Sequence, residues 1–167
     1  STSHLGLVTI NVVPTVTVAG FPDITISEGN AGVSNAVFTI TLSQIPAQQV
    51  TILYNTVAGT ATAGVGPGSD FQSTSGQVPF AAGQQSAQIL VPINSDLSDE
   101  PNETFSLVLS SPTNVVLLDT TAIATIQNDD GLSIDDVTVT EGNAGTKIFD
   151  FAVHLSSPSA NTVTVNY

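Results

Sequence analysis

The chain almost lacks positive charge. Lys147 is its single basic residue among 167, against 14 carboxylate side chains, which gives a formal net charge of −13. Nucleic acids and anionic membrane surfaces are bound through clustered Lys and Arg, so we expect neither as a partner. The counter-species that this composition favours is a cation.

Other residue types are scarce as well. Cys, Met and Trp are absent and aromatic residues make up 5% of the chain. The lack of Cys excludes disulfides and thiolate metal sites. No run approaches the roughly 18 apolar residues of a membrane-spanning helix. The start, "STSHLGLVTINVV", has neither a basic region nor a cleavage site, so we expect a mature or excised piece of a longer protein rather than a signal peptide.

Catalytic patterns are missing too. There is no Gly-x-Ser-x-Gly nucleophile elbow and no arrangement that suggests a Ser-His-Asp triad. Paired carboxylates serve glycosidases, but the shortage of aromatic residues argues against a sugar-binding cleft. The sequence therefore predicts a protein that is not an enzyme.

What is present is a period of two. Apolar residues alternate with polar ones along short runs rich in Val, Thr and Ile, and clusters of Gly, Pro, Asn and Ser separate these runs. No stretch longer than a turn has helical periodicity. The pattern predicts an all-β sandwich. The predicted strands include 37–43, 50–54, 85–93, 105–111 and 122–127.

The chain also repeats itself. "ITISEGNAG" at 24–32 recurs as "VTVTEGNAG" at 137–145, and from Glu28 to Tyr54 12 of 27 positions match the residue 113 places later. "VTINVVPTVTV" at 8–18 similarly resembles "ATIQNDDGLSI" at 124–134. We therefore expect three parts: residues 1–20 as the closing strand of a preceding repeat plus a linker, residues 21–130 as a complete domain, and residues 131–167 as the opening strands of a following, incomplete repeat. The predicted closing strand is 7–13.

Negative charge is concentrated in "SDLSDEPNETF", where Asp96, Asp99, Glu100 and Glu103 lie within eight residues with no base nearby. One reading is a solvated acidic loop that keeps the protein soluble. The other is a Ca²⁺ site, because Ca²⁺ takes six to eight hard oxygen ligands that loops at one end of a sandwich can supply together. Mg²⁺ is less suited because it prefers a tight octahedron and retains its waters.

The order of motifs carries a resemblance. "SEGNAG", "NTVAGTATAG", "FAAGQQSAQILVPI", "EPNETFSLVLSSPTN" and "ATIQNDDG" follow one another as they do in Calx-beta domains, modules of sodium–calcium exchangers, integrin β4 and large bacterial surface proteins. The chain resembles this family fully over 24–131 and as a partial second copy over 137–167. The resemblance implies an immunoglobulin-like antiparallel β-sandwich of seven strands, arranged in tandem repeats, that in some members binds Ca²⁺ at one end.

The resemblance also implies a ligand set, with Ser98 contributing its backbone carbonyl. Three departures accompany it: "VGPG" at 65–68 stands as an insertion before Asp70, and Ser95 and Asn128 occupy positions where calcium-binding members often have Asp. The implied metal ligands are Glu28, Asp70, Asp96, Ser98, Glu100, Asp129 and Asp130.

The expected function is a calcium-stiffened structural repeat of an extracellular adhesin or fibre on a bacterial surface. Its expected partners are neighbouring repeats of the same chain or neighbouring subunits. Two alternatives stay open: a regulatory calcium-sensing module, and a subunit of a head-to-tail filament joined by strand complementation.

Overall fold

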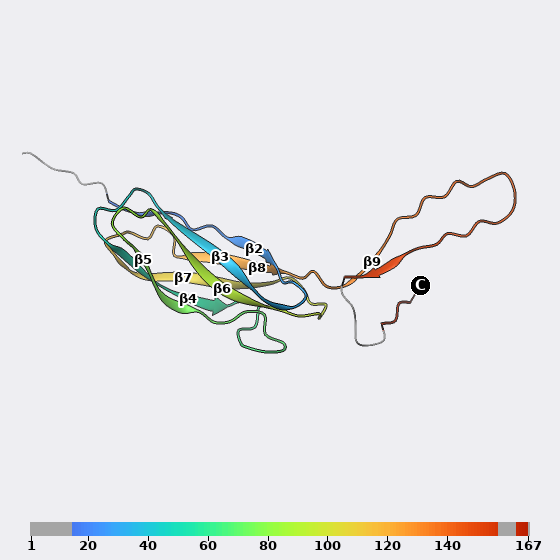
Figure 1. The fold of residues 1–167 in the computed structure, drawn as a ribbon, viewed down its shortest axis with the longest axis horizontal. Coiled ribbons are helices and arrows are strands. Elements are labelled where there is room, and N and C mark those ends of the chain that lie inside the picture. The colour runs from blue at the N-terminus through green and yellow to red at the C-terminus, as the bar shows by residue number, and fades with distance from the viewer. Residues whose placement is uncertain (1–14, 157–162, 167) are drawn as a thin grey trace, which may run out of the picture.

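The computed structural model describes residues 15–156 and 163–166, and within them it contains strands and no helix (Figure 1). No described helix is therefore long and apolar enough to cross a membrane. The strands are β1 (Val18–Gly20), β2 (Ile24–Ser27), β3 (Gly32–Leu42), β4 (Val50–Ala58), β5 (Ser75–Phe80), β6 (Ser86–Ser95), β7 (Glu103–Thr113), β8 (Thr121–Gln127), β9 (Leu132–Ile134) and β10 (Val153–Leu155).

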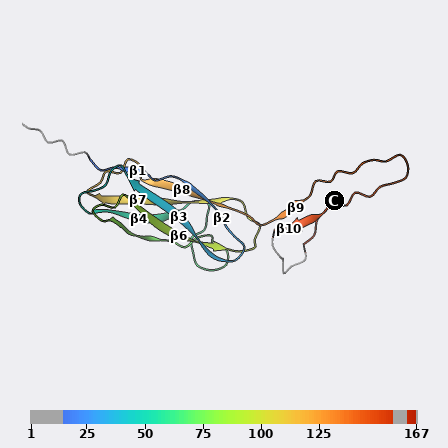
Figure 2. The same cartoon turned by 45° about the horizontal axis from the view of Figure 1, so that its top comes forward.

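The first eight strands form two sheets that pack face to face. One sheet has the order β1-β3-β6 and the other the order β2-β8-β7-β4-β5. Every pairing within them is antiparallel except that of β2 with β8, which is parallel. Figures 1 and 2 show the resulting elongated sandwich. The predicted all-β, immunoglobulin-like sandwich is confirmed, with one parallel pair in place of a wholly antiparallel pattern.

The chain changes sheets between β1 and β2. β1 pairs with β3, whereas β2, three residues later, pairs with β8 in the other sheet. Pro22 lies in this break and has no N–H to donate to a ladder, which favours an interruption here. The seven strands implied by the resemblance are therefore eight segments, because the opening strand is divided between the sheets.

The sandwich also begins earlier than the expected residue 21. Val18 and Phe21 are both buried, and Thr17 forms a bridge with Val116. Residues 17–20 therefore belong to this domain rather than to a linker, since Val18 lies in its core and Val18 and Gly20 pair with β3. The predicted closing strand at 7–13 lies outside the described residues.

The predicted alternation sets the core. Along β3 the side chains of Phe38, Ile40 and Leu42 are fully buried while the residues between them face outward. The Phe105 ring stacks on Phe71 with 4.3 Å between centroids and meets the Phe38 ring edge-on at 6.0 Å. Three rings from separate elements thus fill the centre of the sandwich.

The C-terminal part is built differently. β9 and β10 form an antiparallel pair, and Figures 1 and 2 show the chain between them extending away from the sandwich. No residue of 132–156 or 163–166 is buried. This part of the chain has strands but no core of its own.

Replacing Phe105 tests the aromatic centre. Because Phe105 is fully buried between two other rings, Phe105→Ala leaves a cavity and we expect a loss of roughly 3–5 kcal/mol in the free energy of unfolding. The control Val57→Ala, on an exposed position of β4, should change it by less than about 0.5 kcal/mol. Urea denaturation measures both, and equal effects would contradict this account of the core.

Candidate metal centre

The acidic residues meet at one end of the sandwich because β2 and β8 run parallel. The ladder ends with Ser27 opposite Gln127, and the Glu28 N–H donates to the Gln127 carbonyl at 2.9 Å. Glu28 therefore follows β2 at the same end of the sandwich at which Asp129 and Asp130 follow β8. Residues 100 positions apart in sequence are neighbours here.

The connection from β6 to β7 reaches the same end. β6 finishes at Ser95, whose hydroxyl donates to the Glu28 carbonyl at 2.6 Å. Asp96 follows directly, and the chain then turns back to start β7 at Glu103, opposite Ile126 of β8. The carboxylate-rich β6–β7 loop thus begins and ends at the end of the sandwich that carries Glu28.

Asp70 lies in the connection between β4 and β5. Its Oδ2 accepts a hydrogen bond from the Thr62 N–H at 2.5 Å, and its carbonyl accepts one from the Asn94 N–H at 2.9 Å. These contacts hold a side chain that is only 7% exposed. Asp70 therefore has a fixed position although it belongs to no strand.

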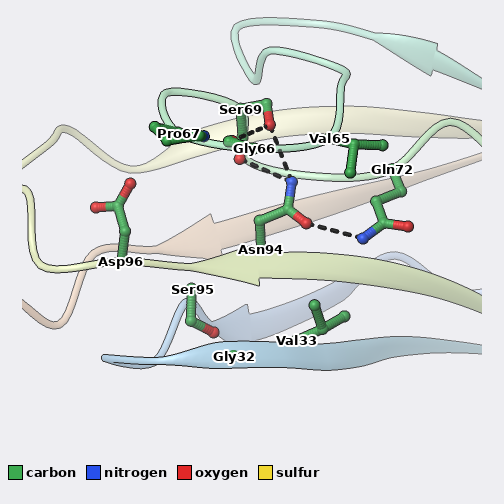
Figure 3. Close-up of a pocket in the computed structure, with 10 residues that line it drawn as sticks. All are labelled: Gly32, Val33, Val65, Gly66, Pro67, Ser69, Gln72, Asn94, Ser95 and Asp96. Carbon is green, nitrogen blue, oxygen red and sulfur yellow. Dashed lines mark hydrogen bonds between the residues drawn. The ribbon is translucent and has the colours of Figure 1, made fainter.

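The insertion at 65–68 forms a loop that Asn94 holds at both ends. The Asn94 side-chain amide donates to the Gly64 carbonyl at 3.2 Å and to the Ser69 carbonyl at 2.9 Å, and so holds both ends of this loop. Figure 3 shows the Asn94 amide beside Ser69. The loop and the ends of β3 and β6 surround a pocket of about 360 Å³ beside Asp96. The insertion thus enlarges the rim without removing Asp70 from the acidic end.

Three carboxylates form the centre of the group. Asp70, Glu100 and Glu103 each offer an oxygen, and these oxygens lie within 4.8 Å of one another. Glu103 was absent from the predicted ligands. Period two places it on the same face of β7 as the buried Phe105 and Leu107, so the alternation held the signal that it points inward.

Burial and mutual repulsion change the acidity of this group. The pKa of Glu28 is raised to about 7, first by burial and then by the negative charges of Asp96, Glu100, Asp70 and Asp130. Glu28 and the four carboxylates that act on it are all predicted ligands, so the structure brings four of these ligands near Glu28. We call these five residues together with Glu103 the acidic cluster.

Glu103 and Glu100 show the same effect. The pKa of Glu103 is raised to about 7 by burial, then by its hydrogen bond with Asp70 and the charges of Asp70, Glu100 and Glu28. The pKa of Glu100 is raised by burial and by the charges of Asp70 and Asp96. Carboxyls that hold protons this strongly lie in a region short of positive charge.

The other two predicted ligands lie differently. The exposed Asp129 turns its Oδ1 to the Gly29 N–H at 3.0 Å, in a turn where Gly29 has φ +84°. The Ser98 N–H donates to Asp96 Oδ1 at 2.7 Å in an exposed turn. Asp129 thus secures the turn beside the cluster, and Ser98 orients Asp96.

The two positions that depart from the family pattern connect segments. Ser95 ties the end of β6 to Glu28 through the hydrogen bond given above. The Asn128 side chain donates to Asp99 Oδ1 at 2.9 Å and to the Asp130 carbonyl at 2.8 Å. Each replaces a potential carboxylate by a group that can donate, so the acidic end has fewer charges and more cross-links.

The family model of the Calx-beta domain matches residues 16–132. This chain belongs to the Calx-beta family. No curated protein matches it significantly.

Solved Calx domains share its fold. The apo-form Calx CBD1 domain is 22% identical, with a TM-score of 0.57 over 69% of this chain and 96% of that one. CBD12 from CALX1.2 is 21% identical, with a TM-score of 0.60 over 77% of this chain and 53% of that one. The calcium binding domain CBD12 of CALX1.1 is 19% identical, with a TM-score of 0.56 over 68% of this chain and 44% of that one. This Calx-beta chain thus spans about half the length of the two CBD12 structures.

The acidic cluster of this Calx-beta domain fits a calcium ion. All six side chains offer carboxylate oxygens, which are the hard ligands that Ca²⁺ takes. Glu28, Asp70 and Asp130 are at least nine-tenths buried, so their charge is poorly solvated. Lys147 donates instead to the Thr140 carbonyl, in the C-terminal part. The chain's own basic residue is therefore engaged elsewhere.

The raised pKa values predict how stability depends on pH in the absence of divalent cations. Glu28 and Glu103 have pKa values of about 7 when folded, against an ordinary value of 4.5. Between these values the folded chain holds more protons than the unfolded chain, so the free energy of unfolding should fall as pH rises through this window. Denaturation in chelator at several pH values measures this dependence.

Glu28→Gln and Glu103→Gln should each flatten the pH profile, because they remove a charge that repels its neighbours. Asp150→Asn, an exposed acid in the C-terminal part, is the matched control and should leave the profile unchanged. A stability that rises from pH 5 to pH 7 would show that the cluster is not under repulsion.

Proposed function

We propose that this Calx-beta domain binds Ca²⁺ at the acidic cluster and serves as a calcium-stiffened structural repeat. The observation that carries the proposal is the convergence of six carboxylates, two of them with pKa values of about 7. They come from the end of β2, the β4–β5 connection, the β6–β7 loop with the start of β7, and the end of β8. The mutual repulsion within such a group opposes folding at neutral pH, and a bound cation would relieve it.

The donor set favours a particular centre for the ion. Asp70, Glu100 and Glu103 would provide the first oxygens, since these already lie within 4.8 Å of one another. Glu28 lies close enough to Glu103 to raise its pKa, and Asp96 and Asp130 in turn raise the pKa of Glu28. A bound Ca²⁺ would neutralise the repulsion and join four segments that are distant in sequence.

Calcium should raise the stability of the chain. Binding to the folded state alone adds about 2.7 kcal/mol at a hundredfold excess over Kd, so the melting temperature should rise when excess Ca²⁺ replaces chelator. Asp70→Asn combined with Glu103→Gln should abolish this shift, because two of the three central ligands are lost. Asp150→Asn should retain it. Identical melting curves with Ca²⁺ and with chelator would refute the proposal.

The proposed structural role rests on the segment that follows the acidic cluster, which contains β9 and β10. Asp129 and Asp130 lie three and two residues before β9, and Asp130 Oδ1 accepts a hydrogen bond from the Ser156 hydroxyl at 3.2 Å, just after β10. A cation held by Asp130 would restrain the segment leading into the next unit. The abundance of Thr, Ser and Val and the near absence of Lys and Arg support the shaft of an extracellular adhesin or fibre on a bacterial surface, with neighbouring repeats as partners.

A regulatory calcium sensor is the second candidate. The contact between Ser156 and Asp130 supports it as well as it supports a structural repeat. Through this contact a change at the site could alter how the next unit is held. A stiffening repeat restricts motion around one arrangement, whereas a sensor moves between two arrangements. The distribution of distances across the junction separates the two roles.

Spin labels can read that distribution, since the chain has no native Cys. We expect labels at Gln88→Cys and Thr146→Cys, both exposed positions on either side of the junction, to give a broad distance distribution in chelator. Calcium should narrow it around one of the distances already present. A new, separate peak on calcium addition would favour the sensor, and the Asp70→Asn, Glu103→Gln double variant should show no change.

A further inference from the structure

The loop that carries the insertion at 65–68 forms one wall of the pocket beside Asp96. The start of β3, at Gly32 and Val33, lies along the other side (Figure 3). The pocket volume of about 360 Å³ falls in the range of roughly 300–1,000 Å³ that small-ligand sites have. Of the acidic cluster, Asp96 alone lines this pocket. It is therefore a cavity separate from the candidate metal centre.

The loop wall has a fixed shape. Gly66 and Gly68 have φ angles of +113° and +75°, which L side chains rarely adopt, and the ring of Pro67 restricts φ between them. The Ser69 hydroxyl donates to the Gly66 carbonyl at 2.6 Å, and Asn94 holds the Ser69 carbonyl as described above. The wall is thus formed in advance, so a ligand would bind with little ordering of the chain.

The two walls carry aliphatic side chains that the fold leaves in water. Val65 is 85% exposed on the loop, and Val33 is 57% exposed on the opposite wall. Pro67 is also exposed. An aliphatic chain lying between these walls would remove apolar surface of both from water, which favours binding.

The two ends of the pocket offer hydrogen-bond acceptors. Asp96 lies at one end and Gln72 at the other (Figure 3). Asp96 Oδ1 accepts the Ser98 N–H at 2.7 Å, and Gln72 Nε2 donates to Asn94 Oδ1 at 3.0 Å. Asp96 Oδ2 and Gln72 Oε1 accept no hydrogen bond from the part of the chain that the structure describes. One charged and one neutral acceptor are therefore available to a ligand.

We propose that this pocket binds a lysine side chain of a partner protein. The ammonium group donates to Asp96 Oδ2, and the aliphatic stem lies between Val33 and Val65. A backbone N–H next to that lysine donates to Gln72 Oε1. Each group that the pocket offers thus meets a matching group of the ligand.

Charge complementarity supports a cationic ligand. The chain has a formal net charge of −13, and the pocket adjoins the acidic cluster. The single basic residue of the chain, Lys147, donates to the Thr140 carbonyl in the C-terminal part. A positive group for Asp96 Oδ2 is therefore expected from a partner.

The geometry favours Lys over Arg and a polypeptide over a free amine. Arg binds a carboxylate best through two parallel bonds to both oxygens, but the Ser98 N–H already occupies Asp96 Oδ1. An ammonium needs only one oxygen. A free alkyl amine has no second donor for Gln72 at the far end, whereas a lysine within a polypeptide has its backbone N–H. These two contacts therefore select the ligand.

The experiment titrates N-acetyl-lysine N-methylamide into the isotope-labelled 167-residue chain and follows its amide signals by NMR spectroscopy. Chelator is present throughout, so the result does not depend on the proposed calcium site. The signals of Val33, Gly66 and the Gln72 side chain report on the pocket. Comparison probes are the norleucine analogue, which lacks the ammonium group, the arginine analogue, and n-pentylamine, which lacks the peptide groups.

We expect the lysine probe to shift these pocket signals. The norleucine analogue should bind at least about tenfold more weakly because it lacks the charge-assisted bond, and Asp96→Asn should weaken the lysine probe similarly. The arginine analogue and n-pentylamine should each bind about threefold more weakly than the lysine probe. Val65→Ser should weaken binding about threefold by removing an apolar wall. The matched control Val57→Ser, at an exposed position of β4, should leave it unchanged.

Equal binding of the lysine and norleucine probes would overturn the proposal, and so would shifts confined to the acidic cluster that Val65→Ser does not alter. Binding of n-pentylamine as tight as that of the lysine probe would assign the pocket to a free amine and overturn the protein partner. Asp70→Asn with Glu103→Gln, which should abolish the calcium-dependent melting shift, should retain the lysine probe. Failure of the calcium proposal and failure of this one are therefore recognised separately.

Discussion

The parallel pairing of β2 with β8 is the contact on which the rest of this Calx-beta domain depends. In the five-stranded sheet, β2 is the first strand in sequence and β8 the last. Their parallel pairing places the residues that follow each strand at the same end of the sandwich. An antiparallel pairing would send Glu28 and Asp130 to opposite ends of the sandwich. Because the pair is parallel, the acidic cluster and the exit toward the next unit occupy one place.

The cluster has an energetic cost that the rest of the fold must balance. Carboxylates at least nine-tenths buried and close to one another oppose folding at neutral pH, as the raised pKa values of Glu28 and Glu103 express. The aromatic centre and the long ladders of β3 with β6 and β4 with β7 provide the opposing stability. A domain arranged in this way is stable without a cation and gains most from one near neutral pH.

The sandwich and the C-terminal part differ in which strands form. β9 pairs with β10 because one continuous segment of chain joins the two strands. The turn at Gly142 forms because Gly142 and Gly145 can adopt positive φ angles. The counterpart of β2, residues 137–140, forms no strand. In the sandwich β2 pairs with β8 alone, and no described strand pairs with residues 137–140 in the same way.

The fold could be predicted almost in full from sequence because alternation is local: Phe38, Ile40 and Leu42 determine which face of β3 is inward without reference to any other strand. By itself the sequence determined the strand class, the core faces and the excess of negative charge, since these follow from composition and from patterns of two residues. The membership of the cluster was predicted only in part. Glu103 lay within reach of the same alternation, but Asp129 and Asp130 are adjacent in a turn, and no periodicity says which of them is buried. The tertiary structure decided that, because the register of β2 on β8 holds the exposed Asp129 at the Gly29 N–H and buries Asp130 near Glu28.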